Sequence, residues 1–408
     1  MGYKKQLLDT LIILGISLLI LVVLERGLRL IYPDKVNESF QPYEFDVPYL
    51  RALKHNIWET FRRSQANGGD IIRWRANKHG FRGDDLQAAP DVRIIVYGDS
   101  NIQARFSHLE NTFPYKLQGY LKGLTGKQIE VINAGLIGFG PDQSLIRFSL
   151  EAEIYKPDIV IFHIFADNDF VDLIKNRLFT LDQRSNAINA NYMVERAQIS
   201  LWSWDEVRET LSSLMITRAA VRIWKEIAGL TGQKDSGHFK PRAELTMEEQ
   251  FERLISASEK DWTMYKEGNS SGGDHYDIDI ALFPRNESSK TKMALMSHVL
   301  KNAKMLADAR NIRFMVMIQP SSRDLTTNLA LNYKHFLQYS GYKRTNLAFA
   351  VDSICRDNKI HKINLFDLFL RSKPETLYFS GRDNHWNDAG QELAAQEVAQ
   401  YIYEKLLD

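Results

Sequence analysis

Five short apolar runs recur along the chain, and segments with helical spacing separate or follow them. The runs cover residues 92–97, 129–132, 158–164, 314–318 and 363–365, and the helical segments cover residues 111–121, 143–155, 290–309 and 389–407. Apolar runs without polar alternation are typical of parallel strands that helices cover on both faces. The pattern therefore predicts an α/β domain over residues 91–408, built on a doubly wound, five-stranded parallel sheet.

The stretch from about residue 171 to 289 interrupts this alternation. It contains two amphipathic helical segments, residues 205–227 and 246–266, and a polar segment rich in Gly and Ser. We interpret it as a helical insertion between the third and fourth strands. Because insertions at the carboxyl ends of parallel strands lie above the ligand crevice, we expect a lid or a substrate-recognition surface. A packing appendage or a subunit contact is the alternative.

The amino-terminal segment is strongly apolar. Residues 10–24 carry no charge and would form about 22 Å of helix. Two lysines precede this stretch and no small-residue cleavage site follows it, which predicts an uncleaved single-pass membrane anchor over residues 1–34, with the remaining chain periplasmic or otherwise extracytoplasmic. A buried core helix or a helix lying on the membrane surface is the alternative. Residues 35–90 show no sustained periodicity, and we interpret them as a lead-in segment that packs on the domain.

Charge and cysteine content exclude several classes of function. Lys and Arg total 52 against 51 Asp and Glu, so no overall field recruits nucleic acid. The only cysteine, Cys355, excludes an intramolecular disulfide and a cysteine-built zinc site, and we expect it to be buried. The histidines form no HxxxH or HExxH motif, and we interpret Asp274, Asp277 and Asp279 as a solvated acidic loop. We therefore expect neither a metal nor a cofactor.

Two side chains with complementary chemistry follow predicted strands. Ser100 comes directly after the first strand, in the sequence YGDSN, and His385 lies in DNHWN, between the last strand and the last helix. Because the carboxyl ends of parallel strands share one edge of the sheet, we expect the two side chains to meet there. A serine hydroxyl needs a base to become a nucleophile, and His385 is the candidate base. Asp383 is placed to hold the other imidazole nitrogen, as the third member of a triad does.

Two loops at the same edge supply candidate donors for an oxyanion. Gly138 lies in the loop after the second strand, and Asn168 follows the third strand. The backbone N–H groups of Ser100 and Gly138 and the side-chain amide of Asn168 are the candidate donors. A tight turn at Gly138 and a helix cap at Asn168 are the alternatives. The sequence GNSSG at residues 268–272 matches a nucleophile elbow but follows no buried strand, so we reject it as a site.

Four sequence blocks, taken together and in this order, resemble those of the SGNH (GDSL-like) hydrolase superfamily. They are YGDSN at residues 97–101, NAGLIGFGPDQ at 133–143, FADNDF at 165–170 and DNHWNDAG at 383–390. The apolar amino terminus and the sequence GFRG at residues 80–83 resemble the branch in which a transmembrane anchor precedes the catalytic domain. The resemblance implies a flavodoxin-like fold with Ser100 as nucleophile, His385 as base, and Ser100, Gly138 and Asn168 as oxyanion donors.

This chain departs from the superfamily pattern at two places. Members often have a glycine one or two residues before the Asn of the third block, where this chain has Asp167 and Ala166. Members also often have Asp three residues before the His of the last block, where this chain has Arg382. Asp383, two residues before the His, keeps the role of orienting group.

The resemblance also suggests an activity, because members of the superfamily are mostly esterases, including enzymes that remove or move acetyl groups on carbohydrates. It predicts a serine esterase that cleaves an O-acyl ester, in the first place O-acetyl, on a cell-envelope or exported carbohydrate or on another small ester. An O-acyltransferase with the same triad is one alternative. A catalytically silent glycan-binding or assembly protein on the same fold is the other.

Overall fold

The computed structural model describes residues 13, 15–17, 19–27, 43–44, 52–53, 55–181, 187–189, 246–269, 273, 275–326, 334–380 and 384–407. The predicted insertion helix at residues 205–227 and the predicted orienting group Asp383 lie outside these residues. Within them, no helix is long and apolar enough to cross a membrane. The membrane anchor stays a prediction.

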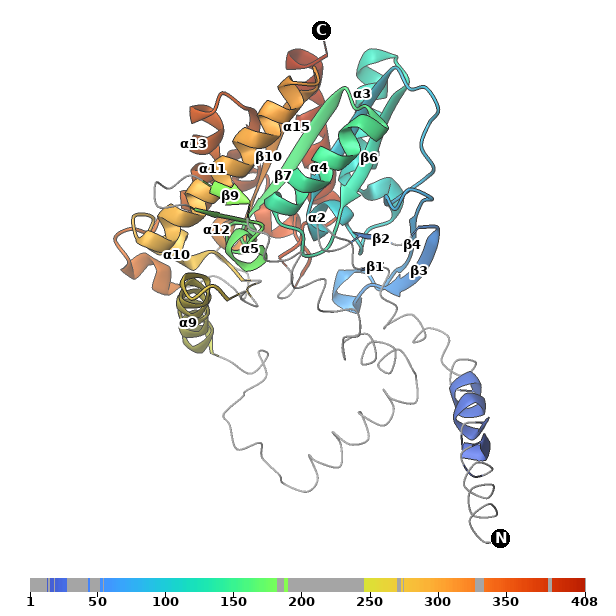
Figure 1. Ribbon diagram of the computed structural model, residues 1–408, viewed down its shortest axis with the longest axis horizontal. Coiled ribbons are helices and arrows are strands. Elements are labelled where there is room, and N and C mark those ends of the chain that lie inside the picture. The colour runs from blue at the N-terminus through green and yellow to red at the C-terminus, as the bar shows by residue number, and fades with distance from the viewer. Residues whose placement is uncertain are drawn as a thin grey trace.

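A five-stranded parallel sheet forms the centre of the domain, with strand order β11-β10-β7-β5-β6 (Figure 1). The strands are β5 (Val92–Gly98), β6 (Ile129–Gly135), β7 (Ile159–Ala166), β10 (Arg313–Pro320) and β11 (His361–Asn364). Every side chain of the central strand β7 is buried. The predicted α/β fold and its five parallel strands are confirmed.

Helices cover both faces of the sheet. On one face α3 (Phe113–Thr125) packs on α15 (Asp388–Lys405). On the other, α11 (Glu287–Asp308) packs on both α4 (Pro141–Tyr155) and α13 (Asn346–Asp357) (Figure 1). The chain leaves β5 toward β6 on one side and later passes to β7, β10 and β11 on the other. Right-handed crossovers in opposite directions place helices on opposite faces, which creates a switch point at the carboxyl end of β5.

Shorter elements surround the carboxyl edge of the sheet. The insertion contributes α9 (Met247–Lys266), which packs on α5 (Asp169–Asn176) and α10 (Ile278–Leu282). The remaining elements that the structure describes here are α2 (Ser100–Gln103), α12 (Ser322–Leu325), α14 (Phe366–Arg371), β8 (Phe179–Leu181) and β9 (Ala187–Asn189). The sequence predicts α9 to within one residue of its observed start.

The lead-in segment contains regular structure that the sequence analysis did not predict. Strand β3 (Ile57–Arg62) pairs in antiparallel register with β4 (Ile71–Ala76), and two-residue strands β1 (Tyr43–Glu44) and β2 (Ala52–Leu53) pair with each other. The segment joins the domain through Arg82, whose backbone N–H donates to the carbonyl of Asn133 at 3.2 Å. The β3–β4 hairpin is therefore tied to the sheet next to β6.

The interpretation of residues 274–279 as a solvated acidic loop is wrong for the two aspartates that the structure describes. Asp277 and Asp279 are buried, and each carboxylate lies 2.9 Å from the buried ammonium of Lys292. A buried carboxylate is stable only when it is paired and hydrogen-bonded, and Lys292 supplies that pairing. Cys355 is buried, as predicted.

Candidate active site

Ser100 is the first residue of α2, directly after β5. The Asp99 side chain caps this helix by accepting the backbone N–H of Asn101 at 2.8 Å. The helix lies so close to β6 that a Cβ atom on Gly135 would overlap the backbone of Gln103. The strand end, the cap and this close approach fix the serine at the switch point of the sheet.

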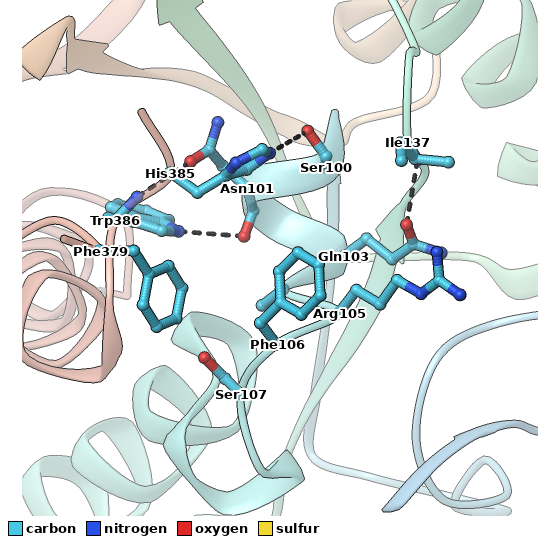
Figure 2. Close-up of a pocket in the computed structure, with 11 residues that line it drawn as sticks. Ser100, Asn101, Gln103, Arg105, Phe106, Ser107, Ile137, Phe379, His385 and Trp386 are labelled. Atoms are coloured by element: carbon cyan, nitrogen blue, oxygen red, sulfur yellow. Dashed lines mark hydrogen bonds between the residues drawn. The ribbon is translucent and has the colours of Figure 1, made fainter. Parts of the chain in front are cut away.

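His385 lies next to Ser100 at the carboxyl edge of the sheet. Its Nε2 lies 2.7 Å from the Ser100 Oγ, within hydrogen-bonding distance (Figure 2). The loop that carries His385 is held by an antiparallel bridge between Tyr378 and Trp386, and the Phe379 N–H donates to the His385 carbonyl at 3.0 Å. The sequence analysis predicted this meeting of Ser100 and His385. Asp383 falls outside the described residues, so its role stays a prediction.

Ser100 and His385 both line a cavity of about 60 Å³. Ile137, Phe106, Phe379 and Trp386 give the cavity mostly apolar walls (Figure 2). The other lining residues are Ser100, Asn101, Gln103, Ala104, Arg105, Ser107 and His385. A water-sized group needs roughly 10–15 Å³ of such space, so the cavity has room for a few heavy atoms next to the hydroxyl.

The two predicted oxyanion loops lie at the expected strand ends. Gly138 sits in the turn after β6 with φ of 69°, a backbone conformation that favours glycine. The preceding Ile137 lines the cavity, and its N–H donates to the Gln103 side chain at 3.1 Å, which ties this loop to α2. Asn168 occupies the N-cap position of α5, although its side chain makes no capping bond. Neither Gly138 nor Asn168 belongs to the described lining of the cavity, and their role as donors stays a prediction.

Asn101, which the sequence analysis did not select, connects the nucleophile to the base. Its carbonyl accepts the indole N–H of Trp386 at 3.0 Å, and its side-chain oxygen accepts the Trp386 backbone N–H at 3.3 Å. The same oxygen accepts the Gln319 amide at 3.1 Å, and Gln319 in turn lies 2.8 Å from Nε2 of the buried His163. Burial lowers the pKa of His163. Asn101 and Trp386 directly follow Ser100 and His385, so these bonds set the spacing of the pair.

If the chain has the esterase activity that the resemblance implies, replacing Asn101 by Ala is expected to lower its kcat by about 10²-fold, with little change in KM. The substitution removes the acceptor for Trp386 and Gln319 and lets the imidazole drift from the hydroxyl. Asn302→Ala is the matched control, because among the described residues the Asn302 amide hydrogen-bonds only to His298 on its own helix. Steady-state kinetics and thermal unfolding of both variants provide the measurement, and a loss confined to KM would contradict the positioning role.

Asp167, at the first departure from the superfamily pattern, is buried and accepts hydrogen bonds from three side chains. Its carboxylate accepts the Arg323 guanidinium at 2.9 Å and the Asn384 side-chain amide at 3.2 Å, and it also accepts the Ser321 hydroxyl. Asn384 is the neighbour of His385. Asp167 therefore links the end of β7 to the loop that carries the candidate base.

Comparison with known proteins agrees with this description. A family model described as "SGNH hydrolase-like domain, acetyltransferase AlgX" matches residues 281–408, which include the His385 block. No protein of curated function matches the sequence.

Several solved structures resemble the chain weakly. A lipase/acylhydrolase from Enterococcus faecalis shares 10% identity, covers 77% of this chain and 96% of its own, and has a TM-score of 0.37. An acetylxylan esterase from Geobacillus stearothermophilus shares 11% identity, covers 78% of this chain and 96% of its own, and has a TM-score of 0.38. The acetyl xylan esterase AlAXEase shares 15% identity, covers 76% of this chain and 100% of its own, and has a TM-score of 0.34.

These similarities are too low to indicate a substrate, and the assignment rests on the family match and the sequence blocks. The match covers the last strand, the His385 loop and α15. The remaining blocks stand at the carboxyl ends of β5, β6 and β7, in the order that the superfamily shows. Residues 281–408 thus match an SGNH hydrolase-like domain, and the four sequence blocks of the chain resemble those of the SGNH (GDSL-like) hydrolase superfamily.

Proposed function

We propose that the protein is a serine esterase that cleaves a small O-acyl ester through a covalent intermediate on Ser100. The observation that carries the proposal is the 2.7 Å contact between the Ser100 Oγ and the His385 Nε2 in a cavity with mostly apolar walls. A hydroxyl hydrogen-bonded to an imidazole is the arrangement that converts serine into a nucleophile.

In the proposed reaction, the Ser100 Oγ forms a bond to the ester carbonyl carbon while its proton moves to His385 Nε2. The carbonyl electron pair becomes an oxyanion, which the N–H groups of Ser100 and Gly138 and the Asn168 amide stabilise. As the carbon–oxygen bond breaks, the protonated His385 donates its proton to the leaving alcohol. Water, deprotonated by His385, then attacks the acyl-enzyme and releases the acid. Asp383 holds the imidazole in the required tautomer.

The dimensions of the cavity support an acetyl group as the acyl substituent. About 60 Å³ accommodates the few heavy atoms of acetyl, and Phe106 and Phe379 are among the residues that line this space. The proposed alcohol portion is a carbohydrate of the cell envelope or of an exported polymer. This assignment combines the predicted membrane anchor and extracytoplasmic placement with the general chemistry of the superfamily.

O-acetyl transfer is the second candidate, because the matching family model is described by an acetyltransferase. The same acyl-enzyme would then react with a sugar hydroxyl instead of water. A silent glycan-binding protein is less favoured, since binding alone gives no reason to keep a serine and a histidine in hydrogen-bonding contact.

Product analysis separates these functions. The protein is incubated with p-nitrophenyl [14C]acetate with and without a xylo-oligosaccharide, and labelled products are resolved by chromatography. We expect release of labelled acetate that Ser100→Ala abolishes. Labelled oligosaccharide at the expense of acetate would assign a transferase, and the absence of both products with wild-type protein would support the silent alternative.

A further inference from the structure

The β3–β4 hairpin contacts the active-site wall, although it lies outside the four sequence blocks. Ser380, which follows the cavity-lining Phe379, donates its backbone N–H to the Asn67 side-chain oxygen at 2.8 Å. The Ser380 hydroxyl also donates to the Ala66 carbonyl at 3.0 Å. Ala66 and Asn67 belong to the connection between β3 and β4. The lead-in segment therefore packs on the chain five residues before His385.

Arg63, the first residue after β3, makes the central contact of this interface. Its Nη2 lies 2.8 Å from both carboxylate oxygens of Asp388, the first residue of α15. Its Nε donates to the Phe106 carbonyl, and its guanidinium carbon lies 5.5 Å from the centre of the Phe379 ring. The Arg63 side chain is only 9% exposed, so these contacts are largely removed from solvent. Charge-assisted and cation–π contacts are stronger in such surroundings.

The same guanidinium thus contacts both phenylalanines of the cavity wall. Phe106 and Phe379 face each other edge to face, with ring centres 6.4 Å apart, on the side of the cavity away from the Ser100 hydroxyl (Figure 2). Phe379 is buried, whereas Phe106 is 37% exposed. Arg63 holds the Phe106 backbone by its bond to the carbonyl, and Asp388 in turn holds the Arg63 guanidinium. The anchor Asp388 is itself fixed by the Ser107 hydroxyl at 2.6 Å.

We propose that Arg63 is a positioning residue that determines acyl-chain specificity. By holding the Phe106 backbone and the Phe379 ring, it sets the width of the cavity and restricts it to short acyl groups. The inference rests on the proposed esterase function and adds to it a determinant from the lead-in segment, which the match to residues 281–408 does not include.

The test compares kcat/KM for p-nitrophenyl acetate and p-nitrophenyl butyrate in the full-length protein. We expect wild-type protein to prefer acetate, and Arg63→Ala to reduce the acetate-to-butyrate ratio by about tenfold, a modest part of the discrimination that the two additional methylene groups of butyrate allow in a pocket. Arg63→Lys is expected to reduce the ratio as well, because lysine keeps the charge but loses the planar, two-pronged contact. Phe379→Ala, which opens the wall directly, is expected to shift the ratio in the same direction.

Arg73→Ala is the matched control, since Arg73 is exposed on β4 of the same hairpin. We expect it to keep the wild-type ratio. Thermal unfolding of every variant identifies any that fail to fold, and Arg63→Lys then carries the test. A wild-type ratio in a folded Arg63→Lys variant, with ester cleavage intact, would overturn this inference alone. Wild-type protein that turns over neither ester would overturn the proposed function and this inference together.

Discussion

Ser100→Ala and His385→Ala are each expected to lower kcat for ester cleavage by about 10⁴- to 10⁶-fold, with KM nearly unchanged. The serine supplies the electron pair and the histidine accepts the proton in one step, so removing either one removes the same pathway. The double variant is therefore expected to be no less active than the less active of the two single variants.

Steady-state kinetics on p-nitrophenyl acetate measure these losses. Ser149→Ala on α4 and His361→Ala on β11 are matched controls, because both residues lie outside the cavity lining and are exposed. Single-variant losses that multiply in the double variant would show that the two groups act independently, contrary to the 2.7 Å contact.

Asp167→Ala is expected to lower the free energy of unfolding by about 3–5 kcal/mol, since it leaves a buried arginine without its partner. Asp167 and Arg323 are 1% and 5% exposed at their side chains, so solvent cannot replace the lost carboxylate. The substitution also frees Asn384, next to His385, and kcat is expected to fall together with stability.

Urea unfolding measures the stability change. Asp308→Ala is the control, because its ion pair with Lys304 is exposed and contributes under about 1 kcal/mol. Replacing both partners, in the double variant Asp167→Ala with Arg323→Met, is expected to restore much of the free energy of unfolding, since neither charge of this pair remains buried. A decrease in the free energy of unfolding below about 1 kcal/mol in Asp167→Ala would show that this buried ion pair does not stabilise the fold as proposed.

The sheet could be predicted from the sequence because its strands are apolar on both faces. Short, mostly apolar runs such as residues 92–97 and 158–164, separated by helical segments, are typical of a covered parallel sheet. Strand β4 alternates apolar and charged residues over positions 72–76 (IRWRA), which is a strand signal, but the run is only five residues long. Its partner β3 (IWETFR) shows no such alternation, so the hairpin was missed. Its stability comes from pairing and from contacts with distant segments.

The candidate pair could also be predicted, because strand ends converge at one edge whatever the intervening sequence. The residues that support the pair could not. Arg63 and Asp388 are 325 positions apart, and no local pattern marks such an ion pair. Asp167 was visible only as a departure from the superfamily pattern, and its partners Arg323 and Asn384 become neighbours only through the fold. Asn101 stood beside the nucleophile, but its bonds to Trp386 depend on the same long-range convergence.

The central claim is that Ser100 is a nucleophile activated by His385. The most direct measurement is labelling of full-length protein with a fluorophosphonate probe, followed by mass spectrometry of the labelled peptide. We expect one phosphonylated residue, Ser100, and a labelling rate that falls by orders of magnitude in His385→Ala. No label on wild-type protein, a label on another residue, or an unchanged rate in His385→Ala would contradict it.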